Sequence, residues 1–192
     1  MRFVFAVILL VCVDPASLRA DDDNPYKAAK VGDWVEYKYS ARNFAAPRGT
    51  EATIKMTVIA KDDKELTYEI GGWVPGVVQK VKIDLTKPHD PIGLAALSNY
   101  HNFGEIKGLD FKAEKLAEGK EKLKVGGKEY DTRWTQMKHT IKFTELPQLG
   151  ERTYVILAKT WVSKDVPLSG QVILETNDGS QMRLELSGFG RK

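Results

Sequence analysis

Alternation of apolar and polar residues with a period of two is the main pattern of the chain from residue 34 onwards. Between residues 34 and 39, for example, the odd positions hold Val, Tyr and Tyr, whereas the even positions hold Trp, Glu and Lys. Successive side chains of a strand point to opposite faces of a sheet, so this period predicts strands with one apolar face. The predicted strands cover residues 34–39, 52–60, 66–70, 77–85, 129–143, 153–163, 170–176 and 181–187.

A few segments depart from this pattern. Residues 24–30 begin with Asn-Pro and predict a short helical turn, because Asn caps helices and Pro suits the first helical position. The Asn-, Pro- and Gly-containing stretch 42–50 predicts a loop. Residues 92–97 have helical spacing and predict a short helix. The charged stretch 111–124 favours a strand, a turn at 118–120 and a second strand.

The fold class follows from this succession of elements. About nine or ten strands with few helices predict a mainly β fold built on one large antiparallel sheet. A sheet of that size tends to curl or close. We therefore expect a curved antiparallel sheet, a half-barrel, with one or two short helices as plug or lid. The segment 92–97 lies between two blocks of strands, where such a plug would sit.

The first twenty residues have the pattern of a targeting segment and are not expected to belong to the folded domain. A basic start precedes an apolar run at 3–13, and a small residue, Ala20, precedes three aspartates. This order is typical of a secretory signal peptide, and the apolar run is too short to cross a bilayer as a helix. We predict a signal peptide at 1–20, a single β-rich domain at 21–192, and a periplasmic or secreted location with no transmembrane segment after signal removal. Cys12 lacks the small preceding residue of a lipidation site.

Composition narrows the classes of partner and cofactor. The chain has 29 Lys and Arg against 26 Asp and Glu, a formal net charge of +3. Because both signs are interleaved along the chain, we expect no nucleic-acid partner. Cys12 is the only cysteine, so the predicted domain can form neither an internal disulfide nor a thiolate metal site.

The sequence offers no recognisable catalytic or metal-binding constellation. His89, His101 and His139 lack the local spacing of metal ligands, and His139 lies among Lys and Thr in a predicted strand, where we expect it to be exposed. There is no Gly-x-Ser-x-Gly elbow and no glycine-rich loop that opens a helix. We predict no enzyme, no cofactor and no metal. An enzyme would need two of these histidines, or one of them and Asp90, to converge in one pocket.

Aromatic side chains are the remaining candidates for a binding site. They occur in several predicted strands or strand ends and supply large apolar contact areas. Their ordinary role is to fill a β core, and lining a ligand cavity is the alternative role for each of them. The candidate ligand-binding residues are Trp34, Tyr37, Tyr68, Trp73, Trp134 and Trp161.

One late segment carries a resemblance to a known family. Residues 161–172 read Trp-x-Ser-x-x-Val-Pro-x-x-Gly followed by a strand, and this segment resembles periplasmic proteins of the lipoprotein-carrier (Lol) type. The segment 31–37 is similar to the opening strand of secreted bacterial proteins of unknown function. The first resemblance implies a half-barrel that wraps around a helical plug and holds acyl chains in its concave face. In physical terms, Pro167 suits a strand end and Gly170 the re-entry into the sheet.

These features lead to a functional hypothesis. We expect a secreted or periplasmic, non-catalytic domain that binds an apolar ligand, a lipid or a lipoprotein acyl chain, in the concave face of the sheet. The alternative is a structural or protein-interaction domain of the cell envelope whose core is filled. The expected partners are accordingly a lipid or other apolar ligand, or an envelope protein.

Overall fold

Nine strands form one antiparallel sheet in the computed structural model, which describes residues 24–43, 46–72, 76–86, 109–143, 152–177 and 181–191. They are β1 (Asp33–Asn43), β2 (Ala46–Lys61), β3 (Glu65–Gly71), β4 (Val78–Asp84), β5 (Leu109–Val125), β6 (Lys128–Phe143), β7 (Arg152–Val162), β8 (Gln171–Asn177) and β9 (Gln181–Arg191). Their order across the sheet is β4-β3-β2-β1-β9-β8-β7-β6-β5. The first and last strands therefore pair in the middle of the sheet, and β4 and β5 are its two edges.

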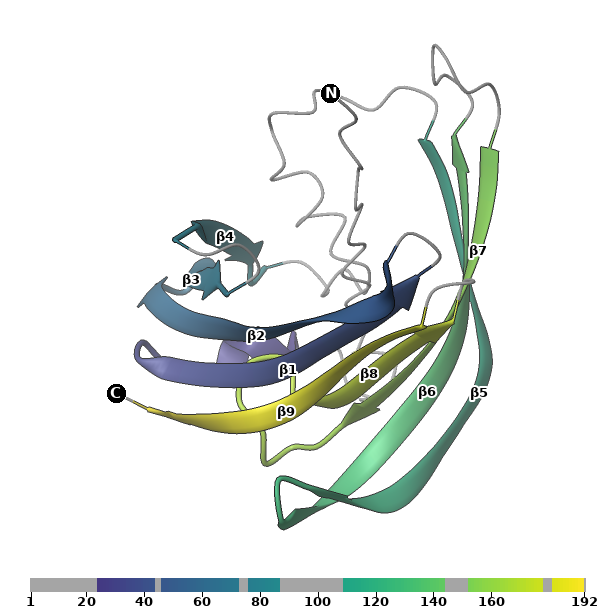
Figure 1. The fold of residues 1–192 in the computed structure, drawn as a ribbon. Coiled ribbons are helices and arrows are strands. Elements are labelled where there is room, and N and C mark those ends of the chain that lie inside the picture. The colour runs from purple at the N-terminus through teal and green to yellow at the C-terminus, as the bar shows by residue number, and fades with distance from the viewer. Residues whose placement is uncertain are drawn as a thin grey trace.

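The sheet is strongly twisted and is not closed into a barrel. In Figure 1, β1, β2 and β9 run across the view, whereas β5, β6 and β7 run nearly upright. Such a turn accumulates over a large open sheet, because each strand is rotated in the same sense against its neighbour. This architecture confirms the predicted mainly β fold with one large curved antiparallel sheet. The predicted plug at 92–97 lies outside the described residues.

The two faces of the sheet differ in character. We call the face that carries Val35 and Tyr37 the core face, because its side chains form most of the buried apolar cluster, and the face that carries Trp34 and Glu36 the polar face. Paired residues of neighbouring strands lie on the same face, so most apolar positions combine into one surface. Trp161, Ile173 and Tyr130 are buried on the other face. Core-face side chains that are 3% exposed or less include Val35, Tyr37, Ile54, Val58, Leu66, Leu174 and Leu184.

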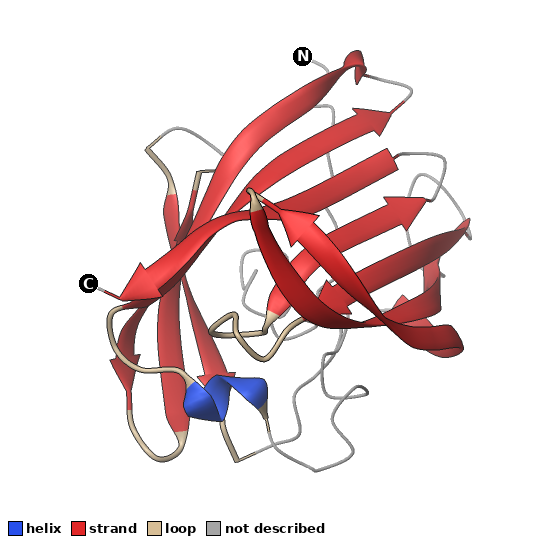
Figure 2. Cartoon of the chain, turned by 90° about the horizontal axis from the view of Figure 1, so that it is seen from below, coloured by secondary structure: helices blue, strands red, loops and turns tan. Residues whose placement is uncertain are grey.

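A single turn of 3₁₀ helix, η2 (Pro25–Ala28), packs on the core face. The Asn24 side-chain oxygen accepts a hydrogen bond from the N–H of Tyr26 at 3.0 Å, which confirms the predicted capped turn. The Tyr26 ring stacks on that of Tyr68, with the ring centroids 6.2 Å apart. Figure 2 shows the helix beside the ends of several strands. The segment between β7 and β8 adds Val166 and Leu168 to the same apolar cluster.

The predicted turn at 118–120 is wrong, because β5 runs unbroken through it. Gly119 lies within the strand opposite Trp134, and a Cβ at this glycine would stand only 2.7 Å from the indole. The glycine therefore makes room for a ring and does not mark a turn. A bulge between Lys115 and Ala117 shifts the alternation by one residue, which explains the ambiguous sequence pattern.

The predicted loop at 42–50 is also replaced by strand. β1 continues to Asn43 and β2 begins at Ala46, and the pairing of Ala41 with Thr50 extends the hairpin ladder. β1 is an internal strand, paired on its other side with β9 up to Arg42. The ladder between β1 and β2, which reaches Asn43 and Ala46, carries strand structure into this stretch despite the low strand preference of Asn, Pro and Gly.

Candidate binding sites on the two faces of the sheet

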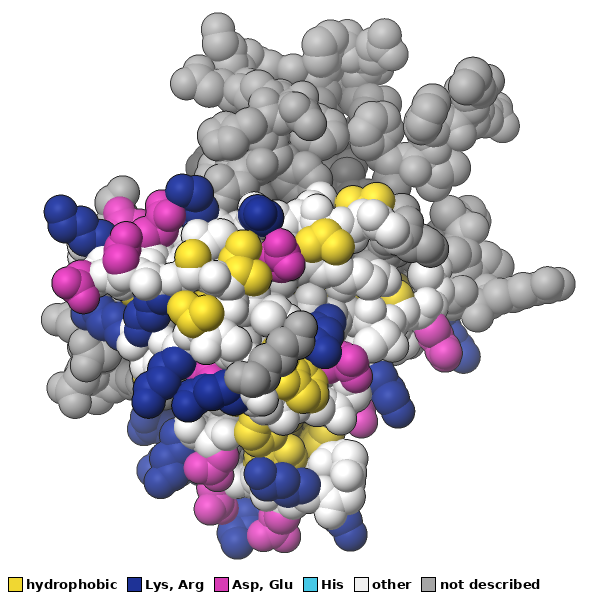
Figure 3. All heavy atoms as spheres, turned by 90° about the vertical axis from the view of Figure 1, so that its left-hand side faces the viewer, with side chains coloured by type: hydrophobic (Ala, Val, Ile, Leu, Met, Phe, Trp, Pro, Cys, Tyr) yellow, Lys and Arg dark blue, Asp and Glu magenta, His cyan; other side chains and the backbone are white. Residues whose placement is uncertain are grey.

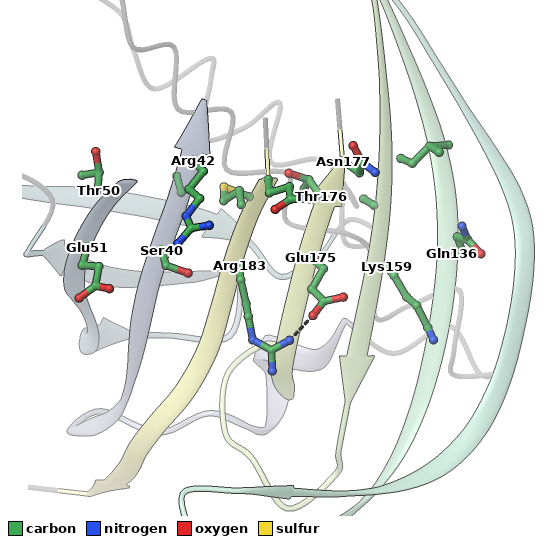
Figure 4. A pocket seen from close by; sticks show the side chains of 15 residues that line it. Ser40, Arg42, Thr50, Glu51, Gln136, Lys159, Glu175, Thr176, Asn177 and Arg183 are labelled. Atoms are coloured by element: carbon green, nitrogen blue, oxygen red, sulfur yellow. Dashed lines mark hydrogen bonds and ion pairs between the residues drawn. The ribbon is translucent and has the colours of Figure 1, made fainter. Parts of the chain in front are cut away.

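A groove of about 670 Å³ is lined mainly by residues of the polar face, together with a few core-face residues such as Ala158, Thr176 and Met182 (Figure 4). Its lining comes from six neighbouring strands, β2, β1, β9, β8, β7 and β6, which together span about 24 Å at the usual strand spacing. The register explains the arrangement, because residues paired across strands stand side by side on one face. One row across the six strands, here called the ladder row, consists of Glu51, Ser40, Arg183, Glu175, Lys159 and Gln136.

Opposite charges alternate along the middle of the ladder row. The Arg183 guanidinium forms an ion pair with Glu175, dashed in Figure 4, and a second with Glu185 at 2.7 Å. These side chains are about two-fifths exposed, so the pairs add little to stability. They do hold the planar guanidinium in one orientation on the groove floor.

A second row of the groove contains no carboxylate. Arg42, Gln181, Asn177 and Leu157 follow one another in register from β1 to β7. Among the described residues, none bonds to the side chains of Arg42, Gln181 and Asn177. A guanidinium and two primary amides supply several N–H donors, which suit a carboxylate or phosphate group. We call these four residues the amide row.

Trp134 and Trp161 lie together at the β6–β7 end of the groove. They are directly paired across the two strands, and the Lys159 Nζ sits 4.2 Å and 4.3 Å from their ring centroids. The indole N–H of Trp161 donates to Glu121 Oε1 at 2.5 Å, and Lys159 Nζ lies 3.9 Å from the same oxygen. Lysine and tryptophan therefore stabilise each other here, and one face of each ring is covered by the chain itself.

Trp34 lies on the same polar face but far from this pair, near the other end of β1. Lys55 Nζ stands 4.4 Å from its ring centroid. Gly188 and Gly190 of β9 leave space for the ring, since a Cβ at Gly190 would lie 3.2 Å from the indole nitrogen. The tryptophan thus covers a glycine-rich stretch of β9, as aromatic residues do for glycines in other sheets.

The two candidate tyrosines lie on the core face. Tyr37 is 3% exposed and its hydroxyl donates to the carbonyl of Gln171 at 3.2 Å, whereas Tyr68 stacks on Tyr26. The predicted binding residues are therefore divided between the two faces: the structure brings Trp134 and Trp161 together but not the whole set. Trp73 lies outside the described residues.

A pair of buried hydroxyls stands out on the core face. Thr135 of β6 and Thr160 of β7 are directly paired, and both side chains are 0% exposed. Neither Oγ1 atom has a hydrogen-bond partner in the described part of the chain. Their neighbours in the same row are Glu118 on the β5 edge and Leu174 on β8. Buried hydroxyls are ordinarily bonded, so an unpartnered pair needs an explanation.

His139 lies two positions along β6 from Met137, on the same core face. The side chain is 1% exposed, so the predicted exposed position is wrong. Burial lowers the pKa of the imidazole, because an apolar environment disfavours the charged form. The polar neighbours Lys138 and Thr140 point to the other face, and this is why the local sequence suggested exposure.

Other classes of site receive no support from the described residues. They contain no group of three or more His, Cys, Asp or Glu arranged to hold a metal ion, and none of their helices is long and apolar enough to span a membrane. On the side of the molecule seen in Figure 3, acidic and basic side chains are interspersed, with small hydrophobic patches between them. His89, Asp90 and His101 lie outside the described residues.

Sequence reasoning missed the groove and the hydroxyl pair. The alternation in β9 places Arg183 and Glu185 on one face of that strand. The sequence does not give the order of the strands, so it could not show that Glu175 of β8 lies beside Arg183. β1 and β9 are separated by most of the sequence, and yet their pairing brings Ser40 beside Arg183. Only the register between strands assembles both sites.

Comparison with known proteins concerns the fold. No family model and no curated protein matches the chain. A Parabacteroides distasonis protein described as a lipoprotein has a similar structure, with a TM-score of 0.50 and 10% identity over 88% of this chain and 100% of that chain. A Bacteroides fragilis protein described as exported and YmcC-like in fold gives 0.49 and 8% identity over 84% and 97%. A DUF1329 family protein from Desulfovibrio piger gives 0.31 and 10% identity over 88% and 94%.

The likeness to the Parabacteroides protein supports the architecture and nothing finer. At 10% identity, the match to the Parabacteroides protein covers nearly the whole of both chains, which is a statement about the fold. None of the three proteins is described as a lipoprotein carrier. The resemblance of residues 161–172 to that family is therefore without support from these structures.

Proposed function

We propose that this protein is exported to the periplasm or the cell exterior and acts there, without catalysis, by binding an apolar ligand on the core face of its sheet. The observation that carries the proposal is the extent of that face in an unclosed sheet. Leu174, Leu184 and Tyr39 continue one another in register across β8, β9 and β1. Apolar surface of this kind takes up acyl chains when they can lie between the sheet and its cover.

Two features support export. The apolar run at 3–13 followed by Ala20 has the order of a secretory signal peptide. The Parabacteroides distasonis protein of similar fold is described as a lipoprotein. Secretion of the chain from its own cells, with loss of residues 1–20, is the expected outcome, and N-terminal sequencing of the exported protein tests it.

Ligand uptake is tested on protein purified after export. Native mass spectrometry is expected to detect a co-purified lipid, and the delipidated protein is expected to bind a fluorescent C16 fatty acid. Ala158→Leu on the core face should reduce this uptake severalfold by filling space beside the apolar row, since Ala158 is 1% exposed. Ala117→Leu on β5 is the matched control. A protein that takes up no amphiphile contradicts the proposal.

The groove favours a second candidate, an interaction domain of the envelope with a filled core. Its specific support is the amide row, where Arg42 and two amides offer donors next to the exposed aliphatic side chain of Leu157, which is 37% exposed. A partner that presents carboxylate or phosphate groups would match these donors. The ladder row and the amide row lie on the face opposite the proposed ligand, so variants in these rows test the second function separately.

Charge reversal in the groove tests this candidate. Arg42→Glu should weaken co-sedimentation of the protein with purified envelope membranes severalfold and reduce its salt dependence, because a donor is replaced by a like charge. Lys164→Glu, on the exposed segment between β7 and β8, changes the net charge equally and is the control. Equal effects of both variants would argue against a groove-specific contact.

A further inference from the structure

The hydroxyl pair of Thr135 and Thr160 is not satisfied within the described part of its own sheet. β6 lies between β5 and β7, and β7 lies between β6 and β8, so both strands are internal. Their backbone N–H and C=O groups are used in the ladders on both sides. The two side chains face each other across the ladder, but their oxygens are without a hydrogen-bond partner among the described residues. Even a bond between the two hydroxyls would leave one O–H donor unused, so an added acceptor would complete the pair.

The surroundings of the pair indicate the chemistry of that group. Across the sheet, the row that contains the pair begins with Glu118, which is 54% exposed at the β5 edge, and continues to Leu174 and Leu184. Polarity therefore falls stepwise from an open edge, through two hydroxyls, to an apolar interior. An ionised group would be costly beside the pair, because the hydroxyls alone compensate poorly for desolvation. A neutral hydrogen-bond acceptor suits the position.

We propose that Thr135 and Thr160 donate hydrogen bonds to the carbonyl oxygen of an acyl ester or amide, and that they select acylated lipids over other apolar chains. This inference rests on the proposed function and names the ligand class for the same face. The acyl chain lies along the row of Leu174, Leu184 and Tyr39, about 14 Å of sheet measured as three strand spacings from β7 to β1. The head group lies towards the β5 edge.

The test compares two lipids that differ only in the carbonyl, 1-palmitoyl-glycerol and 1-O-hexadecyl-glycerol. Both are titrated calorimetrically into the exported, delipidated protein below their critical micelle concentrations. The native protein is expected to bind the ester about tenfold more tightly than the ether, a factor typical of one or two hydrogen bonds in a buried site. Equal affinity for the two lipids would overturn the inference while leaving the proposed function intact. Failure to bind either lipid would refute the proposed function itself.

Two variants assign the preference to the hydroxyls. The double variant T135V/T160V keeps the side-chain shape and should bind both lipids equally, at the affinity of the ether. Its ligand-free melting temperature should be unchanged or raised, because two unpartnered hydroxyls are removed from the interior. The double variant T135S/T160S should retain the preference. A T135V/T160V protein that still prefers the ester would exclude these hydroxyls as the selecting groups.

Thr132→Val is the matched control. The Thr132 hydroxyl is also buried, but it already donates to the carbonyl of Glu121 at 2.7 Å. Its loss should lower the melting temperature and leave the preference for the ester unchanged. Loss of the preference in this variant would mean that general weakening of β6, and not the hydroxyl pair, accounts for the effect.

Discussion

Lysine side chains cover ring faces of three of the four tryptophans. The Lys159 ammonium group lies over the rings of both Trp134 and Trp161, and that of Lys55 lies over the ring of Trp34. A ligand that stacked on these faces would first have to displace an ammonium group from an interaction of about 0.5–2 kcal/mol. Trp34, Trp134 and Trp161 therefore stabilise the polar face by packing against lysines. The buried hydroxyls without a hydrogen-bond partner, those of Thr135 and Thr160, lie on the core face.

Removal of the shared lysine tests this role. Lys159→Ala should expose the indole rings of Trp134 and Trp161 on one side and increase the quenching of tryptophan fluorescence by acrylamide. The free energy of unfolding should fall by about 1 kcal/mol, since one cation lies over two rings. Lys164→Ala is the control, because Lys164 is exposed on a loop. Unchanged quenching would mean that the ring faces are covered by other groups.

Burial of His139 predicts a pH dependence of stability. Its pKa is lowered in the folded protein by burial, whereas in the unfolded chain it stays near about 6.5. The unfolded chain therefore binds the proton first, so the stabilisation is complete above about pH 6.5 and is lost as the pH falls through the folded pKa. In urea titrations between about pH 7.5 and pH 5, His139→Leu should reduce this loss. Parallel curves for both proteins would contradict the assignment.

At the scale of elements, the β5–β6 hairpin depends on a glycine that faces a large ring. A Cβ at Gly119 would lie 2.7 Å from the indole of Trp134, nearer than side chains pack. The hairpin is also the largest contact between any two strands and ends in the Gly126-Gly127 turn, where both glycines have positive φ. Small and large residues are thus placed as complementary partners across the ladder.

A double-mutant cycle tests this complementarity. Gly119→Ala should lower the free energy of unfolding by about 1–3 kcal/mol, the usual cost of overpacking. In the background of Trp134→Leu the same substitution should cost much less, because the ring that it meets is absent. Urea unfolding of the four proteins measures the coupling energy. An equal cost in both backgrounds would show that the strain lies in the backbone and not against the ring.

At the scale of the whole molecule, the β1–β9 ladder joins the two ends of the chain in the middle of the sheet. β1–β4 and β5–β9 are each consecutive meanders, and the pairing of β1 with β9 fuses them. The ladder is fastened at one end by Arg191, whose Nε lies 2.7 Å from Asp33 Oδ1. Contacts between residues so far apart in sequence are typical of slowly folding β proteins.

The ion pair between Asp33 and Arg191 predicts that part of the folding stability is lost at acid pH. Burial acts to raise the pKa of Asp33, but hydrogen bonds from the Arg191 side chain and the Lys30 N–H outweigh it, so the pKa is lowered. The stabilisation is therefore complete above the unfolded value of about 3.9 and is lost as the pH falls below it. Asp33→Asn should lower the melting temperature at neutral pH, and the difference from the native protein should narrow below about pH 4. A constant difference would contradict the role of the carboxylate charge.

The sequence alone determined most of the strands and the buried side of several of them. Period-two alternation identified the apolar positions of β1, β3 and β9, because the alternation of side chains across a strand is a local property. The capped turn at Asn24 was predictable for the same reason, since a cap and its helix are neighbours in the chain.

Tertiary structure decided which side chains meet. The sequence could not tell that Gly119 accommodates a tryptophan, that His139 is buried, or that Ser40 lies beside Arg183, because each fact depends on the register between strands. Register is set by cooperative packing of the whole face and not by local preference. The groove and the pair of Thr135 and Thr160 therefore form only when the strands assemble in register. The strands that contribute these residues are predictable from the local sequence pattern.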